Sequence, residues 1–168
     1  RTLVVETGAK LFAGNFPVTG TGNFTLQSGS HLGIGSAAGI TTSGAIGNIQ
    51  VSGTRLYNSG ATYEYYEGLT PQATGNFLTT TTSGTYPSQV ANLIINKTSP
   101  LQIVNLTNTT NVTGTLTLTS GILNTSTTAA TAPWIRIPAG ATVSPNGGSQ
   151  DSYVDGFIRK QGTTAFDF

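Results

Sequence analysis

Apolar and polar residues alternate in short runs along the whole chain. No segment has apolar residues at i, i+3, i+4 and i+7, the spacing of an amphipathic helix, and Gly, Pro or Asn interrupts almost every window of about a dozen residues. Strict alternation over a few residues is typical of strands with one buried face. The pattern therefore predicts an all-β protein with almost no helix.

A short motif recurs along the chain, an alternating run that leads into a glycine corner. Its copies begin at Leu3, Phe24, Arg55, Leu116 and Ile135, with a degenerate copy from Leu93. The corner residues of these copies are Gly8, Gly29, Gly60, Gly121 and Gly140, with Thr98 in the degenerate copy. Glycine suits a sharp corner because it adopts positive φ without steric penalty.

The copies recur roughly every 20 to 40 residues, and each is too small to bury its own apolar side. Stacking of coils would supply the core. We therefore predict a right-handed parallel β-helix (β-solenoid) with irregular coils, forming one segment over residues 1–168. An antiparallel β-sandwich is the alternative, since short alternating strands are also typical of that class, although a sandwich has no need to repeat the corner.

Alternation assigns the two faces of the predicted strands. In the second copy Phe24, Leu26 and Leu32 point inward, and His31 points outward. Arg55 occupies an otherwise apolar position, so its copy is predicted to lie at a bend or beside an insertion.

One longer insertion is predicted over about residues 64–89. It carries Tyr65, Tyr66, Phe77 and Tyr86, and we expect it to pack as a flap on one side of the stack.

Composition narrows the range of functions. Charged residues make up 8% of the chain, against about 25% in an average soluble domain, so a nucleic-acid surface is not expected. With no Cys and one His, the chain has no disulfide framework, no thiolate nucleophile and no His cluster for a metal. No apolar run approaches the roughly 18 residues that span a bilayer, and membrane insertion is not expected. Since Arg1 begins neither a signal sequence nor a normal initiator sequence, we expect a processed or excised piece of a longer protein.

Hydroxyls and amides replace charge on the predicted surface. Residues 11–54, 68–96 and 98–135 contain no Asp, Glu, Lys or Arg and are rich in Thr, Ser, Asn and Gly. Alternating threonines, as in residues 113–119, are also found in ice-binding solenoids, but such arrays need equal coils, and the spacing here is unequal. Ice binding is therefore a minor alternative.

Carboxylates are too few for a polysaccharide-degrading site to be the favoured prediction. Glu64 and Glu67 form one close pair, and Asp151 and Asp155 lie near the last copy. His31 is predicted to be an exposed strand histidine rather than part of a catalytic triad. We predict no catalytic residue, no cofactor and no metal site.

Aromatic residues suggest a binding alternative. The register points Tyr63 and Tyr65 inward, and Trp134 is expected to serve core packing. Tyr66 and Tyr86 remain candidate contacts for sugar rings, which would make the chain a carbohydrate-binding module.

Several ordered motifs resemble a known family. They are Ser59–Tyr65, Gln72–Gly75, Val90–Asn96, Val112–Gly121 and the closing run Ser152–Lys160. Together they resemble repeat modules of very large cell-surface proteins of Bacteroidota, adhesins or filaments exported by the type IX secretion system and in some cases linked to gliding. The chain departs from the family pattern at Ser99–Pro100, where a small residue and Gly are usual.

The resemblance implies a non-enzymatic, extracellular protein at the cell surface or secreted from it. The family has no shared catalytic residues, and its sorting domain is not visible in this chain. We therefore predict a structural stalk or filament module of a surface adhesin. Its expected partners are neighbouring modules of the same polypeptide or like copies, with surface glycans as a further candidate. Because open strand edges tend to pair, the segment alone is expected to self-associate.

Overall fold

The structure is a computed structural model that describes residues 1–68, 70–76, 89–128 and 133–162. Within these ranges the protein is all-β and contains no helix, and hence none that could cross a membrane. The strands are β1 (Thr2–Val5), β2 (Lys10–Phe12), β3 (Val18–Gly20), β4 (Asn23–Leu26), β5 (His31–Ile34), β6 (Ile49–Val51), β7 (Arg55–Tyr57), β8 (Thr62–Tyr65), β9 (Gln72–Ala73), β10 (Gln89–Val90), β11 (Asn92–Asn96), β12 (Ile103–Asn105), β13 (Thr110–Val112), β14 (Thr115–Asn124), β15 (Ile135–Ile137), β16 (Thr142–Ser144), β17 (Ser152–Asp155) and β18 (Ile158–Lys160).

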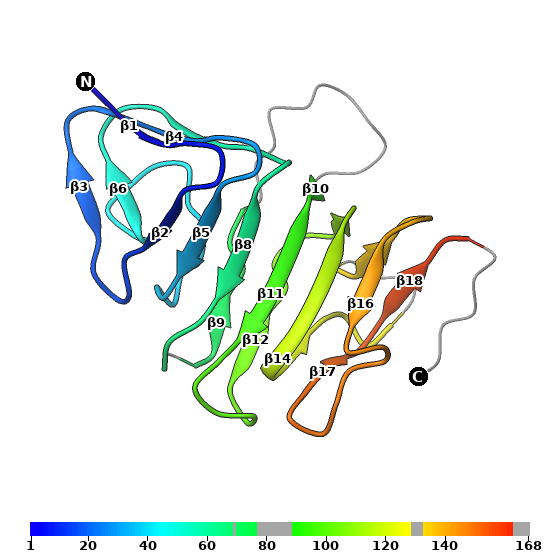
Figure 1. Cartoon of the computed structure of the whole chain (residues 1–168). Helices are drawn as coiled ribbons and strands as arrows, with labels where there is room; N and C mark the ends of the chain where they lie inside the picture. Colours follow the sequence, from blue (N-terminus) through cyan, green and yellow to red (C-terminus); the bar gives the residue numbers. More distant parts are fainter. Residues whose placement is uncertain (69, 77–88, 129–132, 163–168) are drawn as a thin grey trace.

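Parallel pairing dominates the architecture. The strands form curled sheets in which β1-β4-β7, β3-β6 and β10-β13-β15-β18 are three separate rows, and the largest sheet contains β2, β5, β8, β11 and β14 (Figure 1). Every pair of named strands in the described residues is parallel, so the antiparallel β-sandwich considered as an alternative is not the fold. The expectation of an all-β protein with parallel strands is confirmed, and the arrangement is compatible with a β-solenoid-like fold.

The chain returns repeatedly to the same row of strands. Successive aligned positions in this row are Leu11, Leu32, Tyr63, Leu93, Leu116 and Val143. We call the passage from one such position to the next a circuit, and each circuit takes about 20 to 30 residues. In Figure 1 the row runs across the molecule, with β1 and β18 on opposite sides.

The apolar core follows these aligned positions. Leu32, Tyr63, Leu93 and Leu116 are each at most 1% exposed, because every one is covered by circuits on both sides. Leu3, which occupies an inward position of the first circuit, is 43% exposed because only one neighbouring circuit covers it. Burial thus depends on the stacking of circuits, as the sequence pattern predicts.

The glycine corners divide into two kinds. Gly8, Gly29 and Gly60 stack directly, since the amide of Gly8 donates to the carbonyl of Gly29 and the amide of Gly29 donates to that of Gly60. Gly121 instead lies inside β14, opposite Ser152 of β17, and near Lys97. The prediction that all these glycines share one corner is therefore wrong.

Strand register explains that correction. Leu93 and Leu116, which begin two copies of the motif, align with Tyr63 of β8 and not with Arg55 of β7. The same sequence motif therefore begins in the row of β7 in the early circuits and in the row of β8 in these later circuits. Alternation and glycine spacing do not distinguish the two placements, because both give the same inward and outward faces.

The described part of the predicted insertion contains strands. Residues 64–65 belong to β8 and residues 72–73 form β9, which pairs with β12, so this part of the segment is sheet structure. Phe77 and Tyr86 lie outside the described residues.

The cross-section of the fold changes along the row. The row β1-β4-β7 occupies only the first three circuits, whereas β9, β12, the second half of β14, and β17 form a row that the first circuit lacks. The last circuit, which contains β16, β17 and β18, has no strand in the row of β1. The two ends of the molecule are consequently unlike.

Candidate functional site

A cluster of side chains lies on the outer face of the largest sheet. We call Phe12, His31, Glu64, Tyr66 and Asn96 the outer cluster. Phe12 of β2 and Glu64 of β8 occupy aligned outward positions with Gly33 of β5 between them, and Asn96 ends β11. The cluster therefore joins side chains from four successive circuits that are far apart in the sequence.

Packed aromatic rings form one part of the outer cluster. The Phe12 ring lies 5.0 Å from the His31 ring and 5.1 Å from the Tyr66 ring, the latter edge-on at 73°. A Cβ at Gly33 would come within 2.2 Å of the Phe12 ring, so the ring occupies the space above this glycine. Phe12 remains 44% exposed and offers an apolar surface to solvent.

Hydrogen bonds to the Glu64 carboxylate form the other part of the outer cluster. His31 Nε2 lies 2.9 Å from Glu64 Oε2, and Asn96 Nδ2 donates to Glu64 Oε1 at 2.7 Å. The hydrogen bond from His31 is the largest cause that lowers the pKa of Glu64, and Asn96 adds to it, while partial burial opposes them. The Glu64 carboxylate is thus held in its charged form with both oxygens occupied.

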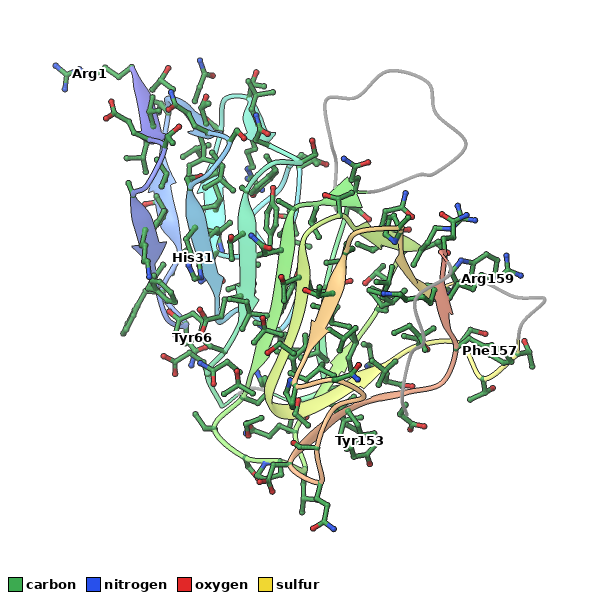
Figure 2. The ribbon with its side chains drawn as sticks, turned by 45° about the vertical axis from the view of Figure 1, so that its right-hand side comes forward. Arg1, His31, Tyr66, Tyr153, Phe157 and Arg159 are labelled. Carbon is green, nitrogen blue, oxygen red and sulfur yellow. The ribbon has the colours of Figure 1, made fainter. Side chains whose placement is uncertain are left out.

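Tyr66 anchors the edge of the outer cluster. Its hydroxyl accepts a hydrogen bond of 2.6 Å from the backbone amide of Gly14, and burial raises its pKa. Tyr66 therefore has a fixed ring position beside the exposed Phe12. His31 and Tyr66 lie on the part of the molecule nearer the N-terminus, as labelled in Figure 2.

Two buried cations near the sheets have structural partners. The Arg55 guanidinium is 7% exposed and donates to the carbonyls of Val51, Thr41 and Gly44, so it lies beside the loop after β5, as predicted for a position next to an insertion. Lys97 is 3% exposed and donates to the carbonyl of Tyr66 at 3.0 Å and to Gln72 Oε1 at 2.8 Å. Burial lowers the pKa of Lys97 to about 8.

The candidate acids do not converge on one groove. Glu64 lies in β8, whereas Asp155 ends β17 and Asp151 precedes it in the last circuit. Within the described ranges no group of three or more His, Cys, Asp or Glu side chains is placed to hold a metal ion. The two predicted pairs of acids therefore lie in different parts of the fold, while Glu64 and Glu67 both lie close enough to Tyr66 to contribute to its raised pKa.

The aromatic predictions have mixed outcomes. Tyr63 and Tyr65 are buried, as the register predicts. Tyr66 joins the outer cluster, and Tyr86 lies outside the described residues. Trp134 is only half-buried, and the Arg159 guanidinium lies 4.7 Å from its ring centroid, so its surroundings are partly those of a surface residue.

Sequence reasoning missed Phe12 and Asn96 as members of the cluster, and it missed the contact of His31 with Glu64. The only feature in the sequence that these residues share is an outward position at a similar place along successive strands. That signal becomes visible only when the circuits are aligned, and the unequal circuit lengths conceal the alignment.

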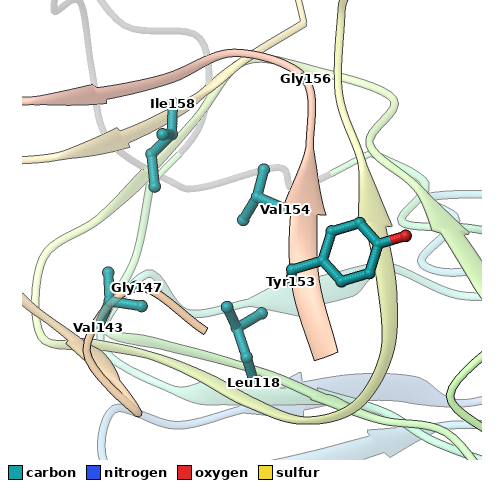
Figure 3. Close-up of a pocket in the computed structure, with 7 residues that line it drawn as sticks. All are labelled: Leu118, Val143, Gly147, Tyr153, Val154, Gly156 and Ile158. Atoms are coloured by element: carbon teal, nitrogen blue, oxygen red, sulfur yellow. The ribbon is translucent and has the colours of Figure 1, made fainter. Parts of the chain in front are cut away.

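A second candidate feature is an apolar cavity of about 140 Å³ in the last circuit (Figure 3). Leu118 of β14, Val143 of β16, Tyr153 and Val154 of β17, and Ile158 of β18 line it together with two glycines. It lies at the end of the molecule where Figure 2 labels Tyr153 and Phe157.

Comparisons of the chain with family models, curated proteins and solved structures found no match.

Proposed function

We propose that this chain is a non-enzymatic structural segment, a stalk or filament module of an extracellular bacterial surface adhesin, wound as a right-handed parallel β-helix. The observation that carries the proposal is the long row of parallel strands from β2 to β16, with β1 and β18 on opposite sides of the molecule (Figure 1). A continuous ladder of this kind transmits load through many hydrogen bonds and spaces whatever is attached to its ends.

The surface chemistry supports the same function. Outward positions at aligned places carry Thr62, Asn92, Thr115 and Thr142, and the hydroxyls of Thr115 and Thr142 lie 3.0 Å apart. Such a surface of amides and hydroxyls remains hydrated while making few ionic contacts with other macromolecules. That property suits a spacer that must keep its sides free.

Electron cryomicroscopy of the native surface protein, labelled with an Fab raised against this chain, tests the proposal. The Fab is expected to decorate the shaft between the cell and the tip, with strand rows continuing along the same axis on both sides of the label. Decoration confined to the tip would contradict the stalk function and make the segment a binding head.

Glycan binding at the outer cluster is a second candidate, favoured by one observation. Phe12 is 44% exposed and is held between His31 and Tyr66, and a flat apolar ring with polar neighbours suits the C–H face of a sugar. A glycan array compares the wild type with Phe12→Ala. Leu101→Ala is the matched control, because Leu101 is 82% exposed and lies in a different part of the fold.

Binding that is lost in Phe12→Ala and retained in Leu101→Ala would support this second function. An array without a signal for the wild type would contradict glycan binding, and the stalk function would be the only remaining proposal.

A further inference from the structure

The last circuit leaves core positions uncovered that are sealed in the interior circuits of the row. Leu116, Leu123 and Ile135 of the preceding circuit are each 0% exposed. The residues aligned with them in the last circuit are Val143, Val154 and Ile158, and all three are only partly buried. The difference has a direct cause: among the described residues no further strand follows β16, β17 or β18 in these rows.

These three residues surround the apolar cavity described above. Val143, Val154 and Ile158 approach it from three different strands, and Tyr153 contributes to its lining (Figure 3). A volume of about 140 Å³ is enough for a branched aliphatic side chain. The cavity is therefore the place that an inward residue of one more circuit would occupy.

We propose that this end of the molecule is a docking site for one further parallel β-circuit, which inserts a branched aliphatic side chain into the cavity and pairs with β16, β17 and β18. The inference rests on the proposed function and specifies its partner. It continues the interface that already joins each pair of circuits, with the same parallel pairing and the same inward aliphatic positions.

A second copy of this chain is a poor occupant. Its first circuit presents β1, β2 and β3, and it has no strand in the row to which β17 belongs. Head-to-tail stacking of two copies would leave β17 without a partner strand. The matching circuit must instead resemble the last one, with three strands in the rows of β16, β17 and β18.

A peptide with the sequence of residues 142–160 is a suitable probe, since it contains all three strands of that circuit. Fluorescence anisotropy of the labelled peptide, titrated with the full chain, is expected to show saturable binding. Val154→Arg in the protein is expected to weaken binding at least ~10-fold, because it places a charge in the apolar cavity.

Two further variants control the experiment. Leu3→Arg makes the same kind of change at the opposite end, where Leu3 is 43% exposed, and is expected to leave binding unchanged. Val143→Glu alters the cavity at a residue that is only partly buried, so the fold should tolerate it, and it is expected to weaken binding. Far-UV circular dichroism of each variant confirms that the sheets are retained.

Equal affinity of the wild type, Val154→Arg and Val143→Glu, or no binding of the peptide, would overturn the inference. Sedimentation that shows a dimer dissociated by Val154→Arg would also overturn it, since the cavity would then belong to a second copy. Neither outcome would by itself contradict the stalk function, which depends on where the Fab binds along the native protein.

Discussion

At the scale of single residues, the fold depends on a glycine that leaves room for an aromatic ring. Gly33 lies between the aligned outward positions of Phe12 and Glu64. Its φ is not in the left-handed region, so backbone freedom does not explain it. The close approach of the Phe12 ring explains why glycine occupies this position, because a Cβ there would lie 2.2 Å from a ring carbon.

Gly33→Ala is therefore expected to destabilise the protein by about 1–2 kcal/mol, because the Phe12 ring must move out of its place between His31 and Tyr66. Urea denaturation followed by circular dichroism measures the change. Gly68→Ala is the matched control, since the nearest atoms to an added Cβ there would lie at 3.7 and 3.8 Å, which are ordinary van der Waals contacts. In a Phe12→Ala background the cost of Gly33→Ala should largely vanish, and a cost that persists there would contradict the explanation.

At the scale of strands, the alternating pattern predicts which side of each strand faces the core. Phe24, Leu26 and Leu32 are each at most 1% exposed, as the register of the second copy requires. The pattern fails to place the strands in rows, because one motif occurs at two different corners, before β8 in one circuit and within β14 in another.

The candidate site is less predictable than the strands. Tyr66 could be selected from the sequence as an aromatic residue outside the alternation, but its neighbours come from other circuits. The contact of His31 with Glu64 depends on the register between β5 and β8, which aligns His31 with Thr62, 31 positions later in the chain. Local spacing carries no information about a pairing that is set by the length of the loops between strands.

The contact between His31 of β5 and Glu64 of β8 makes the stability of the protein depend on pH. The pKa of Glu64 is lowered in the folded protein, so the unfolded state binds a proton at a higher pH than the folded state does. The stabilisation is present above the ordinary glutamate pKa of 4.5 and is lost as the pH falls through the lowered value. Urea midpoints measured from pH 6 down to pH 3 should therefore decrease, and they should decrease less in His31→Gln.

A double-mutant cycle checks that assignment. In a Glu64→Gln background, His31→Gln is expected to leave the acid dependence unchanged, because the carboxylate that it acts on is gone. An equal effect of His31→Gln in both backgrounds would show that the pH dependence arises elsewhere.

At the scale of the whole molecule, the stacked core is rich in tyrosine. Burial raises the pKa of Tyr57, Tyr63 and Tyr65 above the usual value of 10.0. Each hydroxyl donates to a backbone carbonyl, of Thr41, Asn58 and Thr74 respectively. These rings therefore keep their protons in the folded state at a pH where an unfolded chain would release them.

Stability is consequently expected to fall as the pH rises above about 10, since the unfolded state then binds fewer protons than the folded state. Absorbance at 295 nm, recorded together with circular dichroism, should show these tyrosines ionising only as the sheets unfold. Tyr63→Phe should make the decline of stability with pH less steep. Complete ionisation of all tyrosines in a protein that keeps its sheets would contradict the expectation.

The burial of Arg55 and Lys97 has a consequence for proteolysis. Trypsin cleaves after Lys and Arg, and the chain has only seven such residues. Between Lys10 and Arg136 the sole cleavage sites are these two, which are 7% and 3% exposed and held by backbone and side-chain acceptors. A folded molecule should therefore resist tryptic digestion over most of its length and lose only pieces near its ends.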